Sequence, residues 1–238
     1  MIACNKPNVE IIEELMRHQE ILLNLKNDRG YTGLLIAAHA GFTNAVKAIL
    51  TCESRRDVDP NIKNDAKLDA LYYALILSYG DIAKLLIDHP SIDLTTTYDV
   101  NRNTLMHVAC QGSDLEIVKY LMRHSNLDFM SENANSTIAF ASAIMGKHTD
   151  TVSYALETEP DLSDFVETSF QYIRKETPRA TIDVLIEHGL DLYETTVTKR
   201  FVGEYLLDND YSKLIDLGCR VIRGDEMVKK FVLKCRIT

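Results

Sequence analysis

A four-residue sequence that occurs twice constrains the fold of this 238-residue chain more than any other feature. Leu-Met-Arg-His ends at His18 and again at His124, 106 positions further along, and close variants of it end at His89 and His188. Three further residues fill the same position of a common template: Cys52, Thr158 and Leu217. Neighbouring template positions are then 29 to 37 residues apart. A repeat of this length indicates a solenoid, in which each unit buries its apolar face against the next.

Each unit has the pattern of two helices joined by a tight turn. In the clearest unit, small and apolar residues at 104–110 are interrupted at 111–114, and residues 115–122 then have apolar side chains at helical spacing. Asp114 lies where the second helix needs an N-cap. The same pattern predicts helix pairs within 32–50, 69–87 and 138–156. Five glycines are predicted to lie in turns: Gly30, Gly41, Gly112, Gly146 and Gly189.

These units resemble the ankyrin repeat, a unit of about 33 residues with the signature T-P-L-H-x-A in a β-turn followed by two helices. Thr104-Leu105-Met106-His107-Val108-Ala109 matches this signature except at the proline. Thr32 followed by Gly33-Leu34-Leu35-Ile36-Ala37-Ala38 lacks the proline and the histidine. The resemblance implies an all-α helical repeat solenoid of about five to six units, in which His107 hydrogen-bonds the neighbouring hairpin backbone.

We expect one ankyrin-repeat domain over residues 1–238. Its expected parts are an N-terminal cap at 1–26, repeats at 27–62, 63–97, 98–131, 132–162 and 163–193, a degenerate repeat at 194–224 and a C-terminal capping helix at 225–238. The shorter steps toward the C-terminus predict an irregular last third. Terminal units must differ from the others because they cover the ends of the stack.

The resemblance also implies that this is a protein-protein interaction module, an adaptor, scaffold or inhibitor. Ankyrin proteins commonly grip partners in a concave groove lined by hairpin tips and first helices. The template assigns to the tips Arg29, Tyr31, Lys67, Leu68, Arg102 and Asn103. It assigns to the ends of the first helices His39, Ile76, Leu77, Gln111, Met145, Lys175 and Glu176. Two interpretations of Ile76 and Leu77 stay open: an exposed apolar patch suited to an interface, or core residues turned inward.

The sequence gives little support for catalysis, a metal or a cofactor. Six histidines are assigned to structure because zinc needs three or four converging ligands, which repeat spacing keeps apart: His18, His89, His107, His124, His148 and His188. Cys52 and Cys110 are interpreted as small structural residues, and no phosphate-binding loop motif occurs. We therefore expect that this protein is not an enzyme. The alternative is an enzyme or effector activity in the degenerate segment 163–238, with the repeats recruiting its substrate.

Charge and cysteine content limit the partners and the compartment. The net charge of −9 disfavours nucleic acid, which needs clustered lysines and arginines. Six of the basic residues lie within 220–238 beside only two acidic ones, so residues 1–219 have a net charge of −13. This acidic body either attracts a basic protein surface or only keeps a long surface soluble.

Five cysteines without a regular framework favour a reducing compartment, and nowhere do eighteen apolar residues run together. We therefore expect the protein to be cytoplasmic and not to associate with a membrane. We also expect it to be a monomer. The chain also resembles the freestanding ankyrin proteins that intracellular bacteria, large viruses and protists use in eukaryotic cells. For a secreted effector of that kind the compartment would be the host cytosol.

Overall fold

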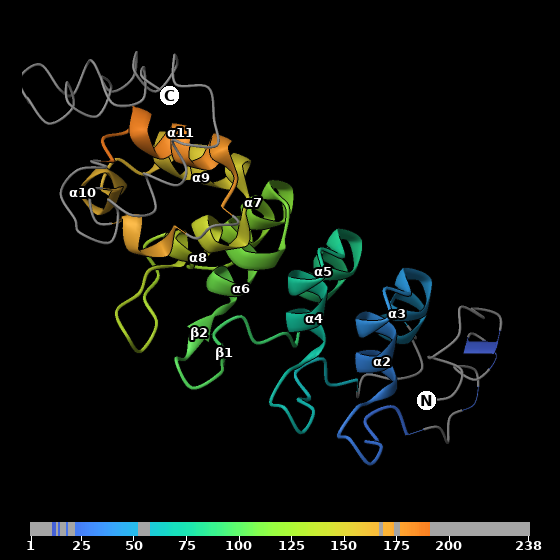
Figure 1. Ribbon diagram of the computed structural model, residues 1–238. Helices are drawn as coiled ribbons and strands as arrows, with labels where there is room; N and C mark the ends of the chain where they lie inside the picture. Colours follow the sequence, from blue (N-terminus) through green and yellow to red (C-terminus); the bar gives the residue numbers. More distant parts are fainter. Residues whose placement is uncertain are drawn as a thin grey trace, which may run out of the picture.

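Paired helices stacked into an elongated array make up the described part of the chain (Figure 1). The computed structural model describes residues 11, 12, 14, 18, 22–51, 58–166, 169–173 and 177–190. Most of the expected N-terminal cap, the degenerate repeat at 194–224 and the capping helix at 225–238 lie outside these residues, as do Cys52, Lys175 and Glu176.

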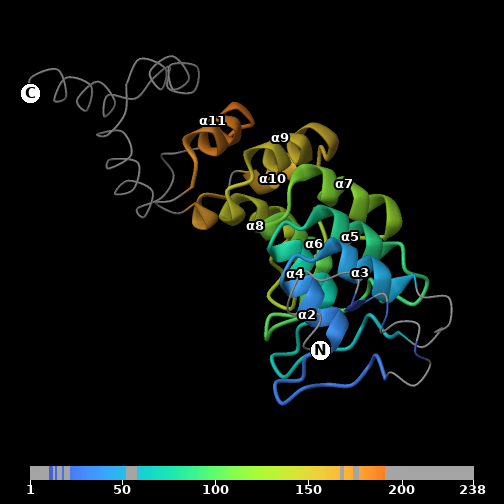
Figure 2. The same cartoon turned by 90° about the vertical axis from the view of Figure 1, so that its right-hand side faces the viewer.

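Four helix pairs follow one another regularly, and we call them repeats 1 to 4. They are α2 (Gly33–His39) with α3 (Thr43–Leu50), α4 (Ala70–Ile76) with α5 (Gly80–Ile87), α6 (Leu105–Gly112) with α7 (Leu115–His124), and α8 (Ala139–Gly146) with α9 (Thr149–Thr158). Figure 2 shows that the first helices form one row and the second helices another. The helix pairs predicted from the sequence pattern are confirmed.

The chain becomes less regular after repeat 4. Where a first helix is expected, the structure has α10 (Leu162–Val166), which has five residues, and a single 3-10 turn, η2 (Ser169–Tyr172). The next full helix, α11 (Arg179–Glu187), packs against α9 as a second helix would. The described part of 163–193 therefore has the predicted irregularity.

Small residues allow the first helices to pack closely. Ala37, Ala74, Ala109 and Ala143 occupy equivalent positions in the four first helices, and each is at most 1% exposed. Cys110 lies beside them and is fully buried, as predicted for a structural cysteine, and burial raises the pKa of its thiol. Such a helix row has short side chains at its contacts, so neighbouring backbones come close.

Polar side chains cap the N-termini of several helices. Thr32 Oγ1 accepts from the Leu35 backbone N–H at 3.2 Å, and Asp69 Oδ1 accepts from Tyr72 at 2.9 Å. Asp114 caps α7 by accepting from Ile117 at 3.2 Å, which confirms its predicted role.

A hairpin tip precedes each first helix. Four tip residues have φ between +53° and +75° and share one template position: Gly30, Lys67, Arg102 and Ser136. In the third tip, β1 (Thr97–Tyr98) and β2 (Asn103–Thr104) form a short antiparallel ladder in which Thr97 pairs with Thr104. Adjacent tips are linked directly, because the Asp65 N–H donates to the Arg29 carbonyl and the Ala134 N–H to the Asn101 carbonyl.

Two of the five glycines do not lie in turns as predicted. Gly112 is the last residue of α6, and Gly146 is the last residue of α8. A Cβ atom on Gly112 would be 2.4 Å from the Ile76 Cα, and one on Gly146 would be 2.5 Å from the Gln111 carbonyl oxygen. These glycines are therefore required by the close approach of neighbouring first helices, and not by a turn.

Replacing Gly112 tests this packing constraint. We expect Gly112→Ala to lower the free energy of unfolding by about 1–3 kcal/mol, because the new methyl group meets backbone that cannot move aside. The measurement is urea unfolding followed by circular dichroism. Gly80→Ala is the matched control and should change stability by less than about 1 kcal/mol, since the nearest atoms belong to the end of the Ile117 side chain. Equal effects of the two variants would contradict the explanation.

Candidate protein-interaction surface

The residues predicted to contact a partner lie on the hairpin tips and first helices, and the structure exposes them to different degrees. Exposed side chains are Arg29, His39, Lys67, Leu77, Arg102 and Gln111. Half-buried side chains are Tyr31, Leu68, Ile76, Asn103 and Met145. Lys175 and Glu176 are outside the described residues.

The structure separates the two neighbours Ile76 and Leu77. Leu77 is 41% exposed, whereas Ile76 packs partly against the core and its backbone lies against Gly112 of the next repeat. The exposure expected under the first interpretation holds for Leu77, and the inward packing expected under the second holds for Ile76, which contacts repeat 3.

Tyr31 and His39 of repeat 1 meet Tyr73 of repeat 2 in an aromatic cluster. The His39 and Tyr73 ring centroids are 4.5 Å apart, and Tyr31 lies 6.1 Å from His39 and 6.2 Å from Tyr73. The two tyrosine hydroxyls are 3.0 Å apart, and Asn64 Nδ2 donates to the Tyr73 hydroxyl at 3.1 Å. Loss of solvent, together with the Tyr31 hydrogen bond, raises the pKa of Tyr73 to about 12. The ring contact between His39 and Tyr73 and the hydrogen bond between the Tyr31 and Tyr73 hydroxyls both join repeat 1 to repeat 2.

Local structure explains why this cluster forms. Asn27 Oδ1 accepts from the Tyr31 N–H at 2.9 Å and so fixes the tip from which Tyr31 projects. Tyr73 precedes Leu77, the C-cap of α4, by four residues, and the Leu77 N–H donates to the Tyr73 carbonyl at 3.1 Å, so the two residues lie on the same face. The exposed Leu77 therefore continues the aromatic cluster along α4.

A buried polar pair lies next to the aromatic cluster. The Tyr98 hydroxyl contacts both carboxylate oxygens of Asp69 at 2.9 Å, and Lys63 Nζ lies 4.8 Å from the centre of the Tyr98 ring. Burial is the main cause that raises the pKa of Asp69, and it raises that of Tyr98 as well. Tyr72, at the position of the signature histidine, contacts the Tyr98 ring at 5.0 Å. This group links the third tip to the first helix of repeat 2.

His107 occupies the same place in repeat 3 and has the role expected for it. Its Nδ1 accepts from the Thr104 backbone N–H at 3.3 Å, and its Nε2 donates to the Thr137 carbonyl of the next tip at 2.9 Å. Burial lowers the pKa of this histidine. The neutral ring thus connects repeats 3 and 4, as Asp69 and Tyr98 connect repeats 2 and 3.

The lowered pKa of His107 predicts a pH effect on stability. The unfolded chain binds this proton more readily, so the stabilisation by neutral His107 is present above the ordinary histidine pKa of about 6.5 and is lost as the pH falls below it. We expect His107→Gln to lower the free energy of unfolding by about 1–2 kcal/mol near pH 7.5. The difference from the wild type should shrink toward pH 5, as measured by urea unfolding. Parallel pH profiles would contradict this assignment.

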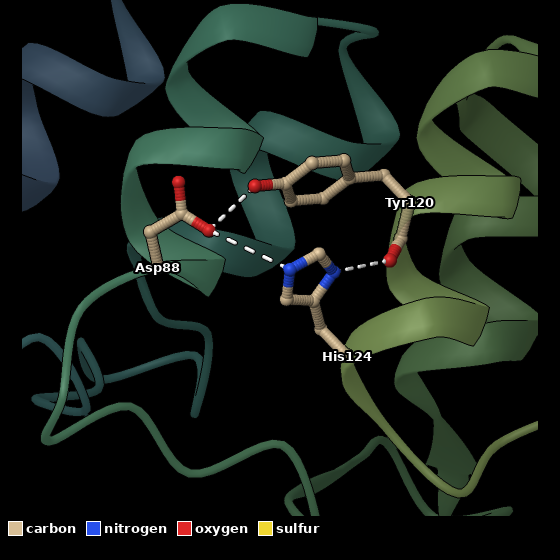
Figure 3. Close-up of polar contacts among 3 residues, drawn as sticks. All are labelled: Asp88, Tyr120 and His124. Atoms are coloured by element: carbon tan, nitrogen blue, oxygen red, sulfur yellow. Dashed lines mark hydrogen bonds and ion pairs between the residues drawn. The ribbon is translucent and has the colours of Figure 1, made fainter.

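The second-helix row has its own polar cluster, drawn in Figure 3. The Tyr120 hydroxyl donates to Asp88 Oδ1 at 2.5 Å, and His124 Nε2 lies 4.0 Å from the same oxygen. His124 Nδ1 donates to the Tyr120 carbonyl at 2.8 Å, and the two rings stack at 4.2 Å. The bond to Asp88 raises the pKa of Tyr120, so the phenol keeps its proton. We interpret this cluster as a contact between repeats 2 and 3, because no activated nucleophile is present in it.

His124 also explains why histidine recurs at the template position. His188 Nδ1 forms the same bond, at 2.8 Å, to the carbonyl four residues before it, that of Val184. In each case the ring donates a second hydrogen bond to a carbonyl in the last turn of the helix; the Val184 carbonyl also accepts from the His188 backbone N–H at 3.2 Å. The structural role predicted for these two histidines is confirmed.

The comparisons with known proteins agree with this repeat architecture. A sequence model of three ankyrin repeats matches residues 1–98, and a model of a single ankyrin repeat matches residues 101–132. This chain belongs to the ankyrin-repeat family. Ankyrin repeats are in general modules that bind other proteins, and proteins of this family are typically not enzymes.

One relative and one solved structure show how far the likeness extends. Human transient receptor potential cation channel subfamily A member 1 is 25% identical over 122 residues, which cover 51% of this chain and 10% of the channel. The chain thus spans about a tenth of that relative's length. The crystal structure of EF0377, an ankyrin repeat protein, matches with a TM-score of 0.63 and 17% identity over 80% of this chain and 96% of its own. At that identity the likeness shows the fold alone.

Sequence reasoning missed three residues of this ankyrin surface. Tyr72 and Tyr73 occupy the template positions of Leu35 and Ile36 in repeat 1. Repeat 3 has His107 and Val108 at these positions, so the pair of aromatic residues in repeat 2 was the available signal. Val100, at the third tip, is 93% exposed. A valine between two polar residues of a predicted tip, Asp99 and Asn101, was a second signal.

Among the residues that the structure describes, no three histidine, cysteine, aspartate or glutamate side chains lie close enough together to hold a metal ion. None of the helices described is long and apolar enough to cross a membrane.

Proposed function

We propose that this chain is a non-catalytic adaptor, scaffold or inhibitor that binds a partner protein in a concave groove formed by the hairpin tips and first helices. One observation carries the proposal: helices α2, α4, α6 and α8 contain no lysine, arginine, aspartate or glutamate. Each of α3, α5, α7 and α9 contains at least one such residue. Many residues of the first helices are uncharged because they are buried, but the partly exposed ones, such as Tyr73 and Met145, are uncharged as well. Interface centres are depleted of charge and enriched in tyrosine, so this partly exposed set suits a binding surface.

The exposed side chains of this row suit an interface. Tyr31, His39 and Tyr73 offer aromatic surface, and Leu77 extends it with an aliphatic group. Aromatic anchors near the centre of an interface commonly account for much of the binding energy. Tyr98 and Cys110, whose pKa values are both strongly raised, are buried in the core, which favours a binding role over catalysis.

Charge and redox chemistry complete the proposal. The net charge of −9 favours a partner with a basic surface, because opposite charges speed the encounter of two proteins. Cys110 is a free thiol in the core, which agrees with a reducing cytoplasmic environment. We propose that the chain acts there as a monomer, with one groove for each partner.

Leu77→Lys tests the proposed groove. We expect the amount of the principal partner captured from eukaryotic cytosol to fall about tenfold or more, because a charge at the centre of an apolar contact is costly to bury. Quantitative mass spectrometry measures the loss. Leu77 is preferred to Ile76 for this test because Ile76 also packs against the core.

Arg123→Glu is the matched control, an exposed substitution on α7 in the second-helix row. It should leave capture unchanged, and urea unfolding should show that both variants are folded. A partner that is lost from Arg123→Glu and retained by Leu77→Lys would place the interaction on the second-helix row and contradict the proposal.

A further inference from the structure

We infer that Tyr31, His39, Tyr73 and Leu77 form a site for the guanidinium group of an arginine in an extended segment of the partner protein. The inference rests on the proposed function and specifies the chemistry that this part of the surface recognises.

The two tyrosine rings present uncharged aromatic faces. Tyr31 and Tyr73 are half-buried and His39 is exposed, so one side of the cluster faces solvent. The hydrogen bonds among Tyr31, Tyr73 and Asn64 hold the two phenol groups in place, and the raised pKa of Tyr73 keeps its hydroxyl protonated. A neutral tyrosine ring has a negative face that attracts cations.

Other tyrosines of this stack already have a cation from the preceding repeat. Lys63 lies 4.8 Å from the centre of the Tyr98 ring, Lys84 lies 5.8 Å from that of Tyr120, and Lys119 lies 4.5 Å from that of Tyr154. Within the described residues, no lysine or arginine lies over Tyr31 or Tyr73. The chain thus uses cation–aromatic contacts repeatedly between its own repeats and leaves this cluster open to a cation from outside.

Charge and shape favour an arginine as that cation. The tips beside the cluster have two acidic residues, Asp28 and Asp65, and two basic ones, Arg29 and Lys67, so their charges cancel. The long-range attraction for a cation therefore comes from the net charge of the whole chain, −9. A planar guanidinium can stack on a tyrosine ring while it donates hydrogen bonds at its edge. The exposed Asp65 has its carboxylate against Gly30, the residue before Tyr31, so an acidic group belongs to the same pair of tips. Leu77 can cover the aliphatic part of the arginine side chain.

A titration of the full chain tests the inference with a defined probe. The tyrosine rings are labelled with ¹³C at the ε positions and followed by NMR while N-acetyl-arginine amide is added. N-acetyl-citrulline amide, which has a similar shape and no charge, is the control ligand. We expect the Tyr31 and Tyr73 signals, assigned with Tyr31→Phe and Tyr73→Phe, to shift about fivefold more with the arginine compound.

Matched variants identify the ring that matters. Tyr73→Leu should reduce the arginine-dependent shift of Tyr31 about fivefold, because it removes the aromatic face. Tyr154→Leu removes a ring that Lys119 already covers and should leave the Tyr31 shift unchanged. Urea unfolding checks that both variants are folded, and the ligand comparison on the wild-type chain stands even where a variant is not.

Several results would overturn the inference: no shift with arginine, equal shifts with citrulline, the largest shifts at other tyrosines, or a larger response to N-acetyl-proline amide, which would indicate a proline-rich segment. The proposed function is tested separately by Leu77→Lys. Loss of a partner from Leu77→Lys without an arginine response would leave the groove standing and refute the arginine site. An arginine response without such a loss would refute the groove as the partner site, and with it the partner arginine, even though the rings bind a guanidinium group.

Discussion

The close approach of neighbouring first helices is the constraint on which the rest of the structure depends. A single helix pair cannot bury its own apolar face, so each repeat is stable only against the next one. The equivalent buried alanines, from Ala37 to Ala143, keep side chains short at these contacts. Gly112 and Gly146 remove the side chain entirely where two backbones meet. Packing at this distance also brings Tyr31 and Tyr73, 42 positions apart in the chain, within hydrogen-bonding distance.

The polar links between repeats are less uniform than the apolar packing. Repeat 3 connects to the next tip through neutral His107 and the Thr137 carbonyl, whereas repeat 2 uses the Asp69 carboxylate and the Tyr98 hydroxyl. Both arrangements satisfy buried polar groups across the same junction, which is the physical requirement. The signature letters can therefore change from repeat to repeat while the fold stays the same.

The two helix rows then divide the surface chemically. The second helices carry the lysines and acids, and some of these act between repeats, as Lys84, Lys119 and Asp88 do with tyrosines of the following repeat. The first helices carry none of them in repeats 1 to 4. An uncharged row that contains exposed aromatic and aliphatic groups can lose water at low cost, which is why we place the binding surface there.

Features that depend only on residues close together in the chain could be predicted from the sequence. The repeat period, the helix pairs, the Asp114 cap and the histidines that end helices follow from local spacing. The selection of Tyr31, His39 and Leu77 as surface candidates came instead from the resemblance to ankyrin repeats, whose groove residues were mapped onto this template. The different exposure of Leu77 and Ile76 follows from contacts between repeats. Adjacent residues of a helix point in different directions, and the neighbouring repeat covers Ile76 and leaves Leu77 exposed. Only the tertiary structure decided that Tyr73 joins the cluster and that Gly112 is a packing residue, because both depend on contacts between repeats, which local sequence does not show.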